Sequence, residues 1–166
     1  MKILRLRAIS PLPGFTLIEV VIVMAIIAIL ALMSMPMFFA KIPRTQVEES
    51  LPLADIAKKA VAGIYLKSGT LPANNDVAEL PEPGKIVGIY VSSVAVVDGA
   101  VTMTFRPDAN GKIAGKRLTW RPVVSVDRRV RSVEWLCAAK KVPDGMDAGG
   151  VDVTDVPRDT MPVSCR

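Results

Sequence analysis

The feature that most constrains this chain is an unbroken apolar run near its start. Residues 20–40 are 21 consecutive uncharged residues, most of them Val, Ile, Leu, Met or Ala. Because an α-helix rises about 1.5 Å per residue, this run spans about 30 Å, which matches the hydrocarbon core of a bilayer. We therefore expect a membrane-spanning helix, and the rest of the 166-residue chain is long enough for one packed domain.

Basic side chains flank the apolar run, three before it and two directly after it: Lys2, Arg5, Arg7, Lys41 and Arg44. This asymmetry favours a cytoplasmic N-terminus by a single charge. A secretory signal peptide has an apolar stretch of about 7–15 residues with a small-residue cleavage site after it. Here the stretch is longer and the conspicuous glycine, Gly14, precedes it. A plain signal anchor fits the length and the flanks but leaves one acid inside the apolar block, Glu19, unexplained.

Glu19 has two interpretations. A carboxylate at the centre of a bilayer costs about 2.5–3.5 kcal/mol on insertion scales, and less near the interface. In the first interpretation Thr16 and Glu19 form a capping box, with Glu19 reaching back to the backbone N–H of Thr16. In the second, Glu19 receives a positive charge from another chain. Cleavage between Gly14 and Phe15 would free an α-amine that neutralises the Glu19 of a neighbour in a packed bundle.

Composition removes most enzyme classes. The chain has no histidine and only two cysteines, Cys137 and Cys165, which argues against Cys/His zinc sites, His-based acid–base chemistry and serine-type triads. We expect no catalytic residue, no cofactor and no metal site. A bridge between the cysteines would contribute roughly 3–3.5 kcal/mol and would persist only in an oxidising compartment, which would place the C-terminal part outside the cytoplasm. Two free, buried thiols are the alternative.

The second half of the helix, residues 41–68, has an amphipathic pattern. Apolar residues recur at steps of three and four and form one stripe that must rest on the globular domain: Val47, Leu51, Ala54, Ala57, Val61, Ile64 and Tyr65. Pro36, Pro43 and Pro52 each remove a helical hydrogen bond, so we expect kinks there, and the pattern leaves open whether Pro43 and Pro52 break the helix. Gly69 is a candidate C-cap, after which Pro72 prevents continuation.

The rest of the chain predicts an antiparallel sheet. Turn-forming residues fill 69–85, and Asp98-Gly99 is a strong hairpin signal between two β-rich runs. The fold class we expect is α+β, with the long helix packed on a four-stranded sheet whose strands are residues 86–97, 100–106, 118–124 and 132–137. Trp120 and Trp135 are expected in the core rather than on a binding surface.

Charge is polarised along the sheet and the C-terminal segment. Residues 106–141 carry ten basic and three acidic side chains, whereas residues 142–166 carry five acidic and two basic ones. The two segments are expected to contact each other, within one subunit or between neighbours. A basic strip containing Arg128, Arg129 and Arg131 is either a solvated face or a contact for DNA or acidic surface polymers.

Four parts of the sequence carry a resemblance to a known family. Gly14-Phe15-Thr16-Leu17-Ile18-Glu19, followed by Val20-Val21-Ile22-Val23, resembles the processing site and helix start of type IV pilins and related secretion pseudopilins. Residues 113–122, 133–137 and 162–166 resemble the C-terminal half of major pilins that form retractable fimbriae. The closing cysteine pair favours a pilin over a secretion pseudopilin, because the globular domain of the latter commonly lacks it.

The resemblance implies a role for each residue of the N-terminal motif. A prepilin peptidase would cut after Gly14 and methylate the new N-terminal Phe15, and Glu19 would serve filament assembly by pairing with the Phe15 amine of a neighbour. Filaments of this family lengthen or bend between the residues that match Ala28 and Pro36. The segments implied are a leader, a transmembrane and filament-core helix, an amphipathic half-helix, a connecting loop, the sheet and a disulfide-closed C-terminal loop: residues 1–14, 15–40, 41–68, 69–85, 86–137 and 138–166.

The expected function is therefore that of a structural subunit of a type IV pilus, supporting adhesion, surface motility or DNA uptake. The expected partners are further copies of the chain, a prepilin peptidase, inner-membrane assembly machinery and the membrane before assembly, with DNA as a weaker candidate. The precursor is expected in the inner membrane with its C-terminal domain in the periplasm, and the mature protein in an extracellular fimbrium. A minor pilin, a type II secretion pseudopilin and a pilus-borne DNA-binding subunit are the alternatives.

Overall fold

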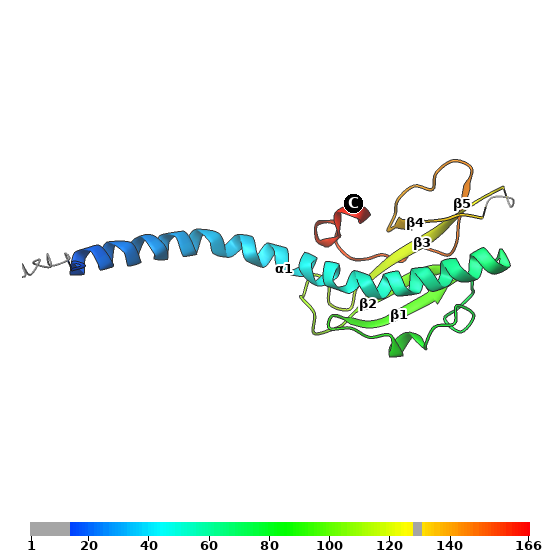
Figure 1. Ribbon diagram of the computed structural model, residues 1–166, viewed down its shortest axis with the longest axis horizontal. Helices are drawn as coiled ribbons and strands as arrows, with labels where there is room; N and C mark the ends of the chain where they lie inside the picture. Colours follow the sequence, from blue (N-terminus) through cyan, green and yellow to red (C-terminus); the bar gives the residue numbers. More distant parts are fainter. Residues whose placement is uncertain (1–13, 128–130) are drawn as a thin grey trace, which may run out of the picture. The chain divides into compact units, whose positions relative to one another are not determined.

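The computed structural model describes residues 14–127 and 131–166, and the chain divides into two units between Phe39 and Ala40 (Figure 1). One helix, α1 (Leu17–Ser68), contributes its first half to the N-terminal unit and its second half to the C-terminal unit. The remaining elements are η1 (Pro83–Lys85), β1 (Val91–Val97), β2 (Ala100–Phe105), β3 (Arg117–Ser125), β4 (Val133–Cys137), β5 (Met146–Ala148), η2 (Arg158–Thr160) and η3 (Val163–Cys165).

The described part of the N-terminal unit is apolar helix. Its segment Leu17–Ser34 has a mean hydropathy of 2.9, and none of this segment is buried by the rest of the molecule. By length and composition this part of α1 can cross a membrane. It has no packed core of its own, so its apolar side chains require lipid or another protein as a partner.

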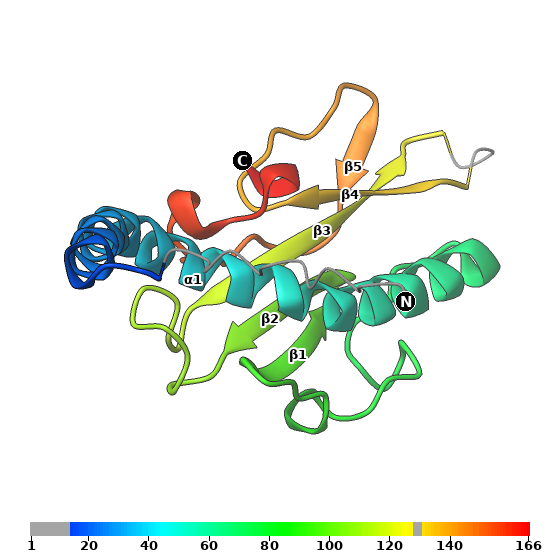
Figure 2. The ribbon, with the colours of Figure 1, turned by 60° about the vertical axis from the view of Figure 1, so that its left-hand side comes forward.

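The second half of α1 packs on the sheet through one buried stripe. Figure 2 shows this part of the helix lying across the strands. The buried positions recur at steps of three and four, as the sequence pattern predicts: Pro43, Val47, Ser50, Ala54, Ala57, Val61 and Tyr65. Leu51 and Ile64, also expected in the stripe, are half-buried at its margins.

The prolines do not break α1. The helix runs without interruption through Pro43, which is buried, and Pro52, which is exposed. Packing against the sheet outweighs the loss of one backbone hydrogen bond per proline. The helix ends where the sequence predicts, because Gly69 adopts φ 76° and its N–H donates to the carbonyl of Tyr65 at 2.8 Å.

The antiparallel sheet has the strand order β1-β2-β3-β4. Asp98 and Gly99, with φ of 48° and 83°, form the predicted tight turn between β1 and β2. Buried side chains from β1, β2 and β3 meet those of α1 in a single core that includes Val94, Met103 and Leu118. Trp120 is buried, and Trp135 is half-buried against the same core.

The expected antiparallel sheet is confirmed, and its strands differ from the expectation in two details. The first strand begins at Val91 rather than at residue 86, because the N–H of Gly88 donates to the carbonyl of Val91 in a tight turn that packs against Leu53. The sheet also has a fifth strand, β5, which pairs with β3 through Val123–Ser125. β5 has three residues, Met146, Asp147 and Ala148, and this is too short a run for an alternating pattern to reveal.

Strand β3 has partners on both edges. β2 and then β5 lie along one edge, and β4 lies along the other. After β5 the chain passes Ala100 at Gly150, whose φ is 65°, and a Cβ there would lie 2.7 Å from the carbonyl oxygen of Val97. The chain then reaches the β4 edge, where the N–H of Asp155 donates to the carbonyl of Arg117 at 3.0 Å.

The outer edge of β1 is covered by a side chain from the loop after α1. Asn75 is buried, and its Oδ1 accepts a hydrogen bond from the N–H of Val96 at 2.7 Å. Its Nδ2 donates to the carbonyl oxygens of Val94 at 3.1 Å and Pro81 at 2.8 Å. The amide therefore bonds to β1 as a neighbouring strand would, and it also fixes the course of the loop.

A disulfide bond closes the C-terminal segment. Cys137, the last residue of β4, is bonded to Cys165 in η3, with their Cα atoms 4.9 Å apart. Both cysteines are buried. The C-terminal turns therefore lie beside the end of β4 (Figures 1 and 2), and the predicted disulfide-closed loop is confirmed.

Candidate functional site

The N-terminal motif lies on the first exposed turn of α1. Phe15 is 78% exposed, and Glu19 is exposed as well. The hydroxyl of Thr16 accepts a hydrogen bond from the N–H of Glu19 at 3.3 Å, and it lies 3.5 Å from the Glu19 carboxylate. Thr16 therefore caps the helix as the first interpretation predicts. Glu19, however, contacts the hydroxyl of Thr16 rather than its backbone N–H, so its carboxylate stays accessible.

Beyond this turn the helix presents apolar side chains on all sides. The more exposed ones include Ile18, Met24, Leu30, Leu32 and Met33, each at least 60% exposed. A soluble monomer rarely presents an apolar surface of this extent. Ser34, the exception within the run, donates its hydroxyl to the carbonyl oxygens of Leu30 and Ala31 and so satisfies its polar group within the helix.

The predicted proline kink lies in this same region. The backbone is helical at Pro36, and α1 continues past it. The kink itself, and its role during filament bending, remain predictions for the assembled state.

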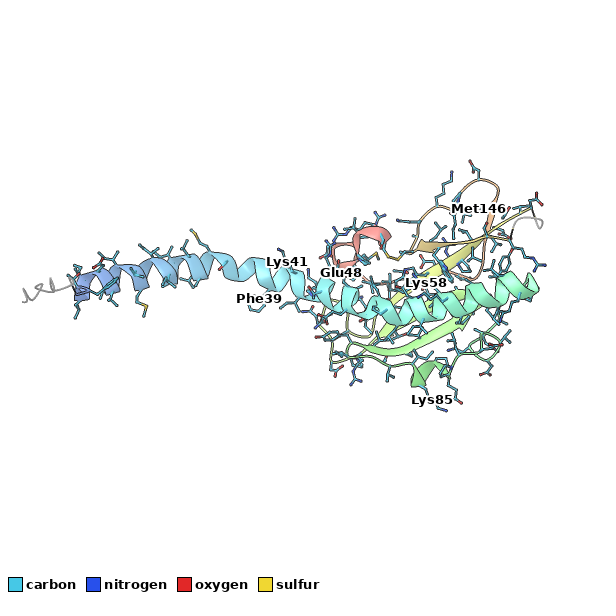
Figure 3. All side chains as sticks on the ribbon, viewed as in Figure 1. Phe39, Lys41, Glu48, Lys58, Lys85 and Met146 are labelled. Atoms are coloured by element: carbon cyan, nitrogen blue, oxygen red, sulfur yellow. A yellow bond between two sulfur atoms is a disulfide. The ribbon has the colours of Figure 1, made fainter. Side chains whose placement is uncertain are left out.

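In the globular unit, one lysine of α1 lies against both tryptophans. The ammonium nitrogen of Lys58 (Figure 3) is 5.6 Å from the ring centroid of Trp120 and 6.0 Å from that of Trp135. The two rings come close together because Trp120 pairs with Cys137 and Pro122 with Trp135 in the β3–β4 register. Lys58 lies outside the apolar stripe that the sequence pattern predicts, and only the register of β3 and β4 could have revealed this contact.

The basic and acidic segments contact each other within one subunit, which is one of the two arrangements expected. Lys112 pairs with Asp159 at 3.0 Å, and Arg117 pairs with Asp155 at 3.5 Å. The hydrogen bond from Lys112 holds the pKa of the Asp159 carboxyl below its ordinary value. These pairs are exposed, so they position the C-terminal segment more than they stabilise it.

The basic strip proposed for DNA lies largely outside the described residues, at Arg128 and Arg129. Arg131 lies within them and has a structural role. Its Nη1 donates to the carbonyl oxygens of Leu66 at 3.0 Å and Lys67 at 3.1 Å, at the C-terminal end of α1. A guanidinium at this position satisfies carbonyl groups without helical partners and complements the negative end of the helix. Sequence reasoning missed this role.

A cleft of about 700 Å³ lies beside this helix end, lined by Tyr65, Ser68, Thr70, Ser125 and Asp147 among others. Much of its polar lining is already used, because Arg131 caps the helix and Ser68 bonds to Ile64 and Thr70. Among residues 14–127 and 131–166, no group of three or more His, Cys, Asp or Glu side chains could hold a metal ion. The candidate functional feature is therefore the exposed N-terminal helix with its one acid.

Comparisons with known proteins agree with this assignment. Residues 43–166 match the family model described as Pilin (bacterial filament), and residues 13–35 match the prokaryotic N-terminal methylation motif. The chain is 39% identical over 160 residues to the Type IV major pilin protein PilE1 of Neisseria gonorrhoeae, which covers 92% of this chain and 86% of that protein.

Two further relatives extend the comparison. A fimbrial protein of Neisseria meningitidis serogroup B is 39% identical over 143 residues, covering 85% of this chain and 81% of that protein. The fimbrial protein EcpC of Eikenella corrodens is 35% identical over 129 residues, covering 76% and 82%. With an exposed apolar helix, a methylation motif at its start and a pilin-type globular unit, this chain belongs to the type IV pilins, the structural subunits of bacterial filaments.

Proposed function

We propose that this chain is the precursor of a major pilin, which is cut after Gly14 and methylated at Phe15 by a prepilin peptidase and then polymerised. The observation that carries the proposal is the exposed apolar helix directly after the methylation motif, with a single accessible acid, Glu19. The precursor resides in the inner membrane with its globular unit in the periplasm. The disulfide supports this orientation because such bonds persist in oxidising compartments.

In this proposal the apolar helices exchange lipid for protein when the filament forms. Packing between helices gains little apolar free energy relative to lipid, so it does not fix the register between subunits. The Phe15 ammonium of one copy pairs with the Glu19 carboxylate of its neighbour and supplies that register, because an unpaired carboxylate in an apolar core is strongly disfavoured. Assembly machinery in the inner membrane accepts the processed subunit.

Three variants separate pairing from capping. Glu19→Ala is expected to leave membrane insertion and cleavage intact but to abolish filaments or greatly reduce them. Thr16→Ala removes the helix cap and keeps the carboxylate, so it is expected to assemble. Glu49→Ala, which removes an exposed acid of α1 outside the apolar run, is the charge control. Electron microscopy and quantification of sheared surface material provide the measurement, and normal filaments from Glu19→Ala would refute the pairing.

Processing has its own test. Replacing Gly14 with a bulky residue is expected to leave an uncut chain of 166 residues in the membrane. Mass spectrometry of the native protein is expected to find Phe15 as a methylated N-terminus. A native protein with its first 14 residues intact would contradict the proposed maturation.

The same sheared fractions test abundance and use. A major pilin is expected to be the dominant polypeptide of the filament, whereas a minor pilin or pseudopilin would be scarce there. Filaments of this subunit support adhesion, surface motility or DNA uptake, and a strain with Glu19→Ala is expected to lose whichever of these the wild type performs.

We further propose that α1 loses a helical turn between residues 28 and 36 in the polymer. A filament map with unbroken helix there would contradict this.

A further inference from the structure

A cationic cleft lies between the end of β4 and the C-terminal turns, and its lining includes none of the residues that the proposed assembly uses. It has a volume of about 440 Å³, within the range of small-molecule sites. Its lining includes four basic side chains and one acid: Lys140, Lys141, Arg158, Arg166 and Asp152. The apolar part of its wall includes Val156, Met161 and Cys165, which are buried.

Two of the four basic side chains are held in place by backbone carbonyl groups. Lys140 Nζ donates to the carbonyl of Ser164, and Arg166 donates from Nε to Met161 at 3.1 Å and from Nη2 to Asp159 at 2.7 Å. The disulfide fixes the backbone on both sides of these contacts, because Cys165 directly precedes Arg166 and Cys137 lies three residues before Lys140. Their cationic groups are therefore positioned before any ligand arrives, which lowers the entropic cost of binding.

The other two, Lys141 and Arg158, are exposed, and within residues 14–127 and 131–166 neither side chain has a hydrogen bond or ion pair. Within the described residues, the nearby acids form no ion pair with these two side chains. Asp159 is paired with Lys112 at 3.0 Å, and Asp152 accepts a hydrogen bond from the N–H of Thr154 at 3.0 Å. The cleft thus keeps an excess of positive charge, and the side chains of Lys141 and Arg158 are available to donate hydrogen bonds to a ligand.

We propose that this cleft binds a phosphate or sulfate monoester carried by a small ligand or a terminal sugar. Lys141 and Arg158 bind the anion directly, and Lys140 and Arg166 add a fixed positive field. A guanidinium together with ammonium groups is the donor set that recognises tetrahedral oxyanions. The volume exceeds that of one phosphate group, so a sugar-sized body fits with it. A concave cleft of this size suits one terminal group better than the regularly spaced phosphates of a duplex.

The test is isothermal titration calorimetry of the full mature chain in a non-ionic detergent. The probes are inorganic phosphate, glucose 6-phosphate, glucose and a short DNA duplex. We expect saturable binding of both phosphate compounds, tighter for glucose 6-phosphate, and none for glucose. The double variant Lys141→Gln/Arg158→Gln is expected to weaken glucose 6-phosphate binding at least tenfold.

The matched control is Lys59→Gln/Lys67→Gln, which removes two exposed lysines of α1 outside the cleft. Its affinity is expected to stay within twofold of wild type. Equal weakening in both double variants would show non-specific charge attraction and would overturn the proposal, as would the absence of saturable binding by wild type. Binding of the duplex alone would assign the surface to nucleic acid and would also overturn it. Circular dichroism and a thiol count confirm that each variant retains its fold and disulfide.

Discussion

Replacing Lys58 by Met should destabilise the globular unit although Lys58 lies at the margin of the core. Its ammonium group lies 5.6 Å and 6.0 Å from the ring centroids of Trp120 and Trp135, and 2.6 Å from the carboxylate of Asp55. Partly exposed cation–π contacts contribute about 0.5–1 kcal/mol each. The Asp55 carboxylate is more than half exposed, so the ion pair adds only about 0.3–0.5 kcal/mol.

The expected loss in the free energy of unfolding is therefore about 1.3–2.5 kcal/mol. For a chain of this length that corresponds to a fall in the melting temperature of roughly 3–10 °C. Met keeps the apolar stem of Lys58 and its packing, so the loss reports the charge. Thermal unfolding of the mature chain in a non-ionic detergent, followed by circular dichroism, measures it.

Two variants decide whether the reasoning holds. Asp55→Asn removes only the ion pair and is expected to cost less than about 1 kcal/mol. Lys59→Met removes the adjacent, exposed lysine and is expected to leave the melting temperature nearly unchanged. If Lys58→Met were no less stable than Lys59→Met, the two tryptophan rings would contribute nothing through the charge and the argument would fail.

Three further predictions follow from the globular unit. Replacing Cys137 and Cys165 together by Ser should lower the free energy of unfolding by about 3.5 kcal/mol. In the wild type both cysteines are buried, so treatment with a reductant and then with a thiol reagent should label them only under unfolding conditions. Arg131→Gln should lower stability by about 1–2 kcal/mol, because the last turn of α1 loses charged hydrogen bonds, and an unchanged urea midpoint would show that water replaces them. Lys112 lowers the pKa of Asp159 in the folded protein. This pair therefore stabilises the fold at pH values above the ordinary carboxyl pKa, and the contribution disappears as the pH falls through the lowered pKa of Asp159. Lys112→Gln should therefore be less stable than wild type at pH 7, with a gap that closes in acid, and a gap independent of pH would contradict the assignment.

The sequence predicted the features that depend on local patterns. The apolar run, the stripe from Val47 to Tyr65, the Asp98-Gly99 turn and the glycine at the end of α1 each follow from periodicity or from one residue's backbone preference. The cysteines alone left a disulfide and two free thiols open, and the resemblance to pilins implied the disulfide. The effect of Pro43 and Pro52 could not be predicted from the sequence. Tertiary packing decides whether a proline interrupts a helix, and the local pattern does not contain that information.

What the sequence did not predict depends on contacts between distant segments. β5 forms because the chain after β4 returns to β3, and three residues carry no recognisable pattern. The contacts of Lys58 and Arg131 depend on the strand register and on the end of α1, which bring their partners close. The cationic cleft likewise requires the disulfide, because Lys140 and Lys141 follow Cys137 while Arg158 and Arg166 lie near Cys165, far along the chain.

Asn75 has a consequence for a protein that works at very high local concentration. Subunits crowded side by side in a membrane or a fibre would tend to join through exposed strand edges, and such pairing leads to irregular aggregates. At β1 the groups of Val94 and Val96 that would invite a foreign strand are already occupied by the Asn75 amide. Edge-to-edge pairing of β1 with a strand of another subunit is thereby blocked, and the filament grows through contacts between the N-terminal helices. Asn75→Ala would expose the backbone groups at the edge of β1. We expect this variant to form irregular aggregates even where the isolated subunit still folds.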